Sequence, residues 1–117
     1  MLQAKRYHII CDLKNCNEKI KDKLAIREFL EGLAKMINMS IIEGPIVAEG
    51  LPDDPGISGV VIIDFSHISI HTFIKYDEAL IDIFSCKEFN KDFALDWCLN
   101  FFGVNKENSR VKEVWWG

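Results

Sequence analysis

The chain has 117 residues, of which 49% are apolar and 27% are charged. This length fits one domain, expected over residues 1–117, and this mixture of residues excludes a disordered chain. The 14 Lys and Arg against 18 Asp and Glu give a net charge of −4. That balance excludes the basic surface of a nucleic-acid binder and gives no general attraction to anionic membranes. We therefore expect no nucleic acid and no membrane among the partners.

The N-terminal segment and the cysteines bear on the compartment. No apolar run approaches the roughly 18 residues of a membrane span, and the N-terminus lacks an apolar signal region. We therefore expect a cytoplasmic protein. The four cysteines are Cys11, Cys16, Cys86 and Cys98. They form no CxxC pair and no Cys/His cluster with zinc spacing, so we expect free thiols and no metal.

The first half of the chain predicts a strand, a helix and a second strand. Tyr7 to Leu13 is a short run rich in β-forming residues. Apolar residues at helical spacing follow, up to Asn38, a residue type that often ends helices. These apolar residues are Ile20, Leu24, Leu30, Leu33 and Ile37. Ser40 to Ala48 predicts a second strand, broken at Gly44-Pro45, and residues 49–56 are dense in turn formers.

The second half predicts three strands, a helix and a last strand. Gly59 to Phe65 is almost continuously apolar, which is typical of a strand covered on both sides, and residues 66 and 67 interrupt it. Residues 67–73 then alternate, with Ile68 and Ile70 on one face and polar side chains on the other. Residues 79–86 predict a strand, residues 90–102 a helix closed by Gly103, and residues 109–116 a final strand.

This order of elements indicates the fold class. Two helices cannot cover both faces of a sheet with six strands. We therefore predict an α+β fold, a two-layer sandwich in which a mostly antiparallel sheet carries both helices on one face. The other face mixes polar with apolar residues and needs a cover, for which a second copy of the chain is a candidate. A homodimer is therefore expected.

The segment from Gly56 to Cys86 concentrates the residues that could do chemistry. It reads GISGVVIIDFSHISIHTF and then IKYDEALIDIFSC, and it brings Ser58, Ser66 and His71 onto strands near Cys86. Taken alone, such residues more often form the solvent-exposed face of a strand than a catalytic site. The segment, however, resembles the small prokaryotic S-adenosylmethionine decarboxylases, pyruvoyl-dependent enzymes of polyamine synthesis. Their pattern is close to GVSGVV, then ESH, then TIHT, then a strand ending in FTC.

The resemblance implies a self-made cofactor and a role for each matching residue. The chain would cleave itself between Phe65 and Ser66, and Ser66 would become a pyruvoyl group, which reacts with the α-amine of an amino-acid-type substrate. His71 would assist cleavage by removing the Cα proton, and Ser58 would hold the cleavage intermediate by hydrogen bonding. Cys86 would protonate the decarboxylated carbon, a task that suits a thiol with a reference pKa of about 8.5.

The spacing of two of these residues sets a geometric condition. Ser66 and His71 are five residues apart, so an unbroken strand would place them on opposite faces. A turn or bulge near Ser66-His67 would reset the register and let them meet. In a regular strand the two residues would not meet.

Three positions depart from the family pattern. Phe65 stands where the family usually has Glu. The loop from Leu51 to Pro55 has no aromatic side chain to stack on adenine. Lys75 stands where an acidic residue holds the ribose hydroxyls, and a cation cannot accept those hydrogen bonds.

These departures leave three functions open. We favour a pyruvoyl-dependent S-adenosylmethionine decarboxylase, with adenine held by other groups such as Tyr76 or Phe73. The first alternative is a pyruvoyl-dependent decarboxylase of a smaller amino acid, arginine or ornithine, whose cationic group Asp53 and Asp54 would pair with. The second alternative is an uncleaved, non-catalytic homologue that acts as a subunit or binding module. Retention of all four matching residues disfavours it.

Overall fold

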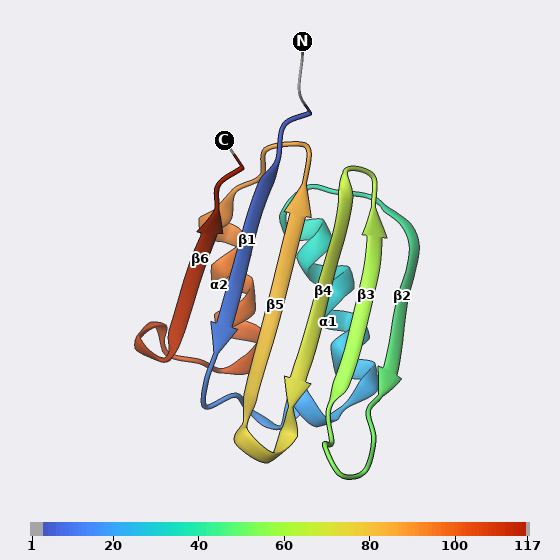
Figure 1. Ribbon diagram of the computed structural model, residues 1–117, viewed down its shortest axis with the longest axis vertical. Coiled ribbons are helices and arrows are strands. Elements are labelled where there is room, and N and C mark those ends of the chain that lie inside the picture. Colours follow the sequence, from blue (N-terminus) through green and yellow to red (C-terminus); the bar gives the residue numbers. More distant parts are fainter. Residues whose placement is uncertain (1–3, 117) are drawn as a thin grey trace.

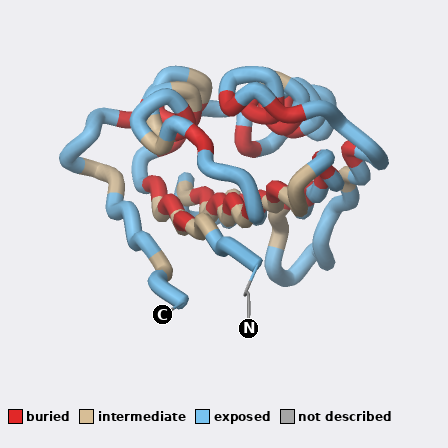
Figure 2. The backbone as a smooth tube through the Cα atoms, turned by 90° about the horizontal axis from the view of Figure 1, so that it is seen from above, coloured by how far each residue is buried: buried red, intermediate tan, exposed pale blue. Residues whose placement is uncertain are grey.

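The structure, a computed structural model that describes residues 4–116, is one twisted sheet with two helices packed on it (Figure 1). Its helices are α1 (Lys23–Met36) and α2 (Lys91–Phe102), with 3-10 turns η1 (Glu18–Lys21), η2 (Ile74–Tyr76) and η3 (Lys106–Asn108). Its strands are β1 (Tyr7–Leu13), β2 (Ile41–Glu49), β3 (Ile57–Ile63), β4 (Ser66–Phe73), β5 (Glu78–Ser85) and β6 (Ser109–Val114). The six strands lie in the order β2-β3-β4-β5-β1-β6, and every neighbouring pair is antiparallel. Both helices lie on the same side of the sheet (Figure 2), so the predicted α+β sandwich is confirmed.

Local hydrogen bonds determine where the helices begin and end. The Asp22 carboxylate accepts a bond from the Leu24 N–H (2.9 Å) and starts α1. The Asn90 side chain accepts from the Phe93 N–H (2.9 Å) and starts α2. Gly103 ends α2 with φ 64°, in the left-handed region that glycine favours. Within residues 4–116, no helix is long and apolar enough to cross a membrane.

The first predicted helical stretch divides into a 3-10 turn and a helix, and one of its apolar side chains does not reach the core. Residues 18–21 form the 3-10 turn η1, and α1 starts only at Lys23. Ile20, Leu30, Leu33 and Ile37 are buried as expected, but Leu24 is 62% exposed. The expectation for Leu24 is wrong because Leu24 and Leu33 lie in the same helix, which turns by about 100° per residue, so Leu24 is on the opposite side from the buried stripe.

The core lies between the helices and the inner face of the sheet. Alternate residues of β4 and β5 point into it, including the predicted Ile68 and Ile70. The large side chains with almost no exposed surface are Phe29, Phe102, Ile9, Leu13, Ile20, Ile26, Leu30, Leu33, Ile63, Ile68, Ile70 and Ile81. This layer sets the register of the sheet, because a slip by one residue would expose the apolar set of a strand.

The side of the sheet that faces away from α1 and α2 is here called the open face. No helix of residues 4–116 covers it. β3 alternates between buried and exposed residues, so the expectation of a strand covered on both sides is wrong for the single chain. Val60 and Ile62 are exposed on this face, and Ile46, which pairs with Val60, is 61% exposed.

Strand ends deviate from the sequence-based expectations by a few residues. The register of β2 shifts between Ile41 and Ile46, in agreement with the break predicted at Gly44-Pro45. The turn between β3 and β4 is formed by Asp64 and Phe65, before the predicted interruption at residues 66 and 67. β6 ends at Val114, so residues 115 and 116 lie beyond the strand.

The contact between α1 and α2 generates a test of the packing. A Cβ atom at Gly32 would lie 2.1 Å from Cζ2 of Trp97, whose Nε1–H donates to the Phe29 carbonyl (3.1 Å). We predict that Gly32→Ala destabilises the fold by about 1–3 kcal/mol through overpacking, although Ala is the better helix former. Urea unfolding measures the change, with Glu31→Ala at the exposed neighbouring position as control. Equal stability of the two variants would contradict this packing.

Candidate active site

The hairpin of β3 and β4 places Ser66 directly after the turn. Ile63 pairs with Ser66, and Asp64 and Phe65 connect the two strands. Ser66 has φ 145°, a positive value that is strained for a residue with a Cβ atom. The strain of the hairpin therefore falls on the residue that the family resemblance assigns to self-cleavage.

The carbonyl group on the N-terminal side of Ser66 is held by a backbone donor. The Cys86 N–H donates to the Phe65 carbonyl oxygen, with 2.9 Å between nitrogen and oxygen. This bond joins the end of β5 to the turn, since Ser66 pairs with Ser85 in the sheet. An N–H at this position polarises the carbonyl and can stabilise negative charge on its oxygen. Cys86 itself is exposed.

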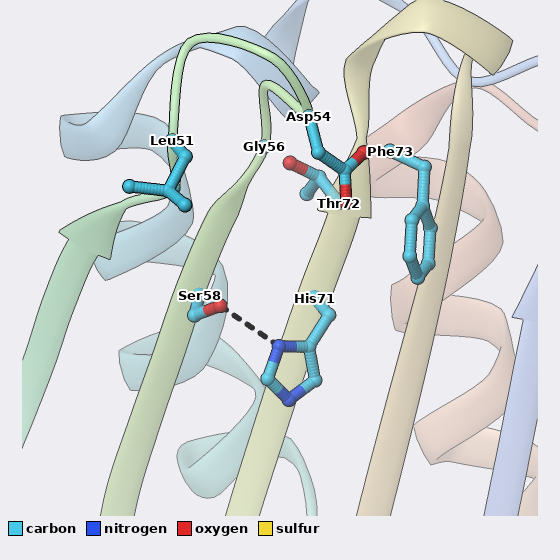
Figure 3. Close-up of a pocket in the computed structure, with 8 residues that line it drawn as sticks. Leu51, Asp54, Gly56, Ser58, His71, Thr72 and Phe73 are labelled. Carbon is cyan, nitrogen blue, oxygen red and sulfur yellow. Dashed lines mark hydrogen bonds between the residues drawn. The ribbon is translucent and has the colours of Figure 1, made fainter.

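A second pair of polar residues lies toward the other end of the same two strands. Ser58 of β3 is opposite His71 of β4, and Ser58 Oγ lies 2.8 Å from His71 Nδ1 (Figure 3). This hydrogen bond orients the imidazole ring. The pair opens onto a pocket of about 240 Å³, which is also lined by Gly50, Leu51, Asp54, Gly56, Thr72 and Phe73.

Within one chain, the Ser58–His71 pair does not meet Ser66 and Cys86. β4 is paired from Ser66 to Phe73 with no register shift against either neighbour, so the expected bulge near Ser66-His67 is not present in this strand. Five residues at about 3.3 Å per residue separate the Cα atoms of Ser66 and His71 by about 17 Å. The expectation that a bulge brings them together is wrong, because β4 is a regular strand.

The residues expected to bind substrate fall into two groups. Phe73 and Asp54 line the pocket beside the Ser58–His71 pair. Asp53 and Tyr76 are not among its lining residues. The Asp53 carbonyl accepts a hydrogen bond from Lys75 Nζ (2.8 Å), and Tyr76 is largely exposed in η2.

The four thiols differ in burial and acidity. Cys11, Cys16 and Cys98 are buried, whereas Cys86 is exposed. Burial raises the pKa of the Cys16 thiol to about 12. The hydrogen bond between the other two buried thiols lowers the pKa of Cys11 and raises the pKa of Cys98. Cys86 is therefore the thiol that a solute can reach.

A cluster of ionisable side chains on the open face was not predicted from the sequence. His8 Nε2 lies 2.9 Å and 3.0 Å from the two carboxylate oxygens of Asp82, and His67 Nε2 lies 3.8 Å from the same carboxylate. The Phe84 ring stacks on His8. Alternation within each strand places these residues on one face, but only the order β4-β5-β1 makes them neighbours. Among residues 4–116, no group of three or more His, Cys, Asp and Glu residues is arranged to hold a metal ion.

The fold has a solved counterpart. The crystal structure of the adenosylmethionine decarboxylase from Aquifex aeolicus is similar with a TM-score of 0.79 and 27% sequence identity. The similarity covers 97% of this chain and 91% of that chain.

The sequence has relatives with the same description. The family model for S-adenosylmethionine decarboxylase matches residues 7–115. An S-adenosylmethionine decarboxylase proenzyme from Thermodesulfovibrio yellowstonii is 42% identical over 82 residues, which are 69% of this chain and 58% of that protein. A proenzyme of the same name from Aquifex aeolicus is 32% identical over 108 residues, 91% of this chain and 78% of that protein. The match to the Thermodesulfovibrio protein thus spans little more than half of its length. Because the family model covers nearly the whole chain, this protein belongs to the S-adenosylmethionine decarboxylase family, as its resemblance indicated.

Proposed function

We propose that this chain is a self-cleaving, pyruvoyl-dependent decarboxylase that acts on S-adenosylmethionine. The observation that carries the proposal is the strained Ser66 beside a carbonyl group that the Cys86 amide already polarises. Self-cleavage needs a hydroxyl next to an activated carbonyl, and these residues fit the formation of a pyruvoyl group. The names of the relatives support S-adenosylmethionine as the substrate.

The cleavage uses atoms of Phe65 and Ser66. The Ser66 hydroxyl adds to the Phe65 carbonyl carbon, the peptide C–N bond breaks, and an ester and a free amine form. A base then removes the Ser66 Cα proton and the Phe65 carboxylate leaves, after which water hydrolyses the remaining enamine and ammonia departs. The products are residues 1–65 and a second chain that begins with a pyruvoyl group. The Phe65 side chain takes no part, so Phe in place of Glu is compatible with cleavage.

The base for this step is His71, oriented by Ser58. Within one chain His71 is about 17 Å from Ser66, which is too far for proton transfer. A second copy has to supply it. We therefore propose a homodimer in which each copy contributes one pair of residues to each of two sites.

The open face is the surface for this dimer. Two sheets pack about 10 Å apart, and stacking them would bury the exposed apolar residues of β2 and β3. A two-fold axis between the sheets, directed across the strands, reverses the strand direction in the second copy. The end that carries Ser58 and His71 in one copy would then lie over the end that carries Ser66 and Cys86 in the other.

The decarboxylation requires an electron sink and a proton donor. A pyruvoyl group made from Ser66 would supply the electron sink for the loss of carbon dioxide from the substrate. The hydrogen bond between the Cys86 amide and the Phe65 carbonyl supports Cys86 as the proton donor. A thiol keeps its proton at neutral pH and can still release it to carbon. Because this thiol has to stay reduced, we propose a cytoplasmic location.

Self-cleavage is tested by the intact mass of the purified protein. We predict two pieces, residues 1–65 and residues 66–117, the second with a blocked, ketone-bearing end. Ser66→Ala is expected to remain whole because it lacks the attacking hydroxyl. Cleavage of this variant, or an uncut wild type, would contradict the proposal, and an uncut wild type would favour the non-catalytic alternative.

The shared site is tested by combining two inactive chains. We predict that Ser66→Ala and His71→Ala are each uncut when expressed alone. When the two are coexpressed, the His71→Ala chain is expected to be cut, because its Ser66 meets the His71 of its partner, while the Ser66→Ala chain stays whole. Native mass spectrometry confirms that mixed dimers are present. Mixed dimers without any cleavage would contradict the shared site.

The role of Cys86 is tested by a variant that separates cleavage from decarboxylation. In Cys86→Ser the backbone N–H remains, so we predict normal cleavage. The serine hydroxyl holds its proton more tightly than a thiol, so release of carbon dioxide is expected to fall by about 10²-fold or more. Both steps are measured on the same preparation, by intact mass and by labelled carbon dioxide. An unchanged rate of decarboxylation would exclude the thiol as proton donor.

A further inference from the structure

We propose that Asp54 provides the negative charge that binds a cationic group of the substrate, and that it thereby sets which amino acids the site accepts. The inference rests on the proposed decarboxylase function, because it concerns the same site. It goes beyond that function by assigning a substrate-binding residue in the loop that departs from the family pattern.

The loop that carries Asp54 is held by its own backbone. The Gly50 N–H donates to the Gly56 carbonyl (2.8 Å) and closes the base of the loop. The Asp54 N–H donates to the Leu51 carbonyl (3.1 Å) and forms a turn inside it. Gly56 packs so closely on β4 that a Cβ atom there would lie 2.1 Å from the Thr72 carbonyl oxygen. These contacts hold the loop backbone, and the Asp54 side chain extends from the loop toward the strand end that carries His71 (Figure 3).

The two neighbouring acids of this loop have different surroundings. Asp54 lines the pocket and Asp53 does not. Lys75 lies against this loop, but its Nζ donates to the Asp53 backbone carbonyl and forms no ion pair with either acid. Among the ion pairs of residues 4–116, none includes Asp54. The Asp54 carboxylate of the pocket therefore has no ion-pair partner among the described residues.

The remaining lining of the pocket favours a cation on an apolar skeleton. Leu51 and Phe73 present exposed apolar surface, and the face of a Phe ring attracts cations. The Thr72 hydroxyl is already used, since it donates to the Ile20 carbonyl and accepts from the Ile57 N–H (2.9 Å each). Asp54 is the one carboxylate among the lining residues, so charge recognition in this pocket falls to it.

The expected ligand is an α-amino acid with a positive charge a few bonds from its α-carbon. In the proposed dimer, the α-amine reacts at the position of Ser66 in one copy, next to the Ser58–His71 pair of the other. The rest of the substrate would extend into the pocket beside that pair, toward Asp54. S-adenosylmethionine has a positively charged sulfur at such a distance, and arginine and ornithine end in a guanidinium or an ammonium group.

The test compares wild type, Asp54→Asn and the matched control Asp53→Asn, each first scored for cleavage by intact mass. Release of carbon dioxide is measured with S-adenosylmethionine, arginine and ornithine. For the accepted substrate, we expect Asp54→Asn to raise KM at least tenfold with a smaller change in kcat. Asp53→Asn removes the same charge outside the pocket and is expected to leave KM within about twofold of wild type. The substrate that turns over identifies the cation as sulfonium, guanidinium or ammonium.

Two further measurements separate charge recognition from a structural effect. Asp54→Glu keeps the charge and is expected to restore most of the affinity. S-adenosylhomocysteine lacks the positive charge of S-adenosylmethionine, so its inhibition constant should be the same for wild type and Asp54→Asn. An unchanged KM in Asp54→Asn, an equal shift in Asp53→Asn or an equal loss of S-adenosylhomocysteine binding would overturn the inference.

The failure of this inference is distinguishable from the failure of the proposed function. A cleaved, active wild type that is indifferent to Asp54→Asn overturns the inference alone. An uncut wild type overturns the proposed function, and calorimetry then decides the role of Asp54. Binding of S-adenosylmethionine, arginine or ornithine to the uncut chain, weakened at least tenfold by Asp54→Asn, would support a cation site. Absence of binding would overturn it.

Discussion

The hydrogen bond from the Cys86 N–H to the Phe65 carbonyl is the contact on which the candidate site depends. It joins the end of β5 to the β3–β4 turn and places a donor on the carbonyl that Ser66 would attack. The bond requires the register in which Ser66 pairs with Ser85. That register is maintained by the buried isoleucines of β4 and β5, because a slip by one residue would turn them toward the open face. Packing of the core thus determines the geometry of the site.

The same packing keeps the Ser58–His71 pair apart from Ser66 and Cys86. Ile68, Ile70 and Thr72 are buried at alternate positions of β4, which leaves the strand straight between Ser66 and His71. β4 can remain regular, and Ser66 can still have a base, if the base comes from another copy of the chain. The apolar side chains exposed on the open face favour the same arrangement, since stacking two sheets would remove them from water. A helix on this face would have blocked it.

The loop before β3 and the proposed catalytic residues differ in what determines their positions. Ser58, Ser66, His71 and Cys86 sit on strands or at strand ends whose positions depend on the core. The residues from Leu51 to Pro55 lie in a surface loop held by backbone hydrogen bonds, so their side chains can vary at little cost to the fold. In this chain the variation places a carboxylate in the pocket. The proposed cation-binding residue therefore lies in a part of the fold separate from the proposed catalytic residues.

Local sequence signals were sufficient for the α+β class, the order of the elements, the ends of α2 and the segment that carries the site. Capping residues, glycines and period-two alternation act over a few neighbouring residues, so Asn90, Gly103 and the buried face of β4 could be located without coordinates. Only the tertiary structure decided that Ser66 and His71 lie apart, and that Asp54 rather than Asp53 lines the pocket. It also revealed the His8–Asp82–His67 cluster. These features depend on strand order, strand register and the position of a loop over the sheet, which arise from packing between segments far apart in the chain and cannot be read from any short stretch of sequence.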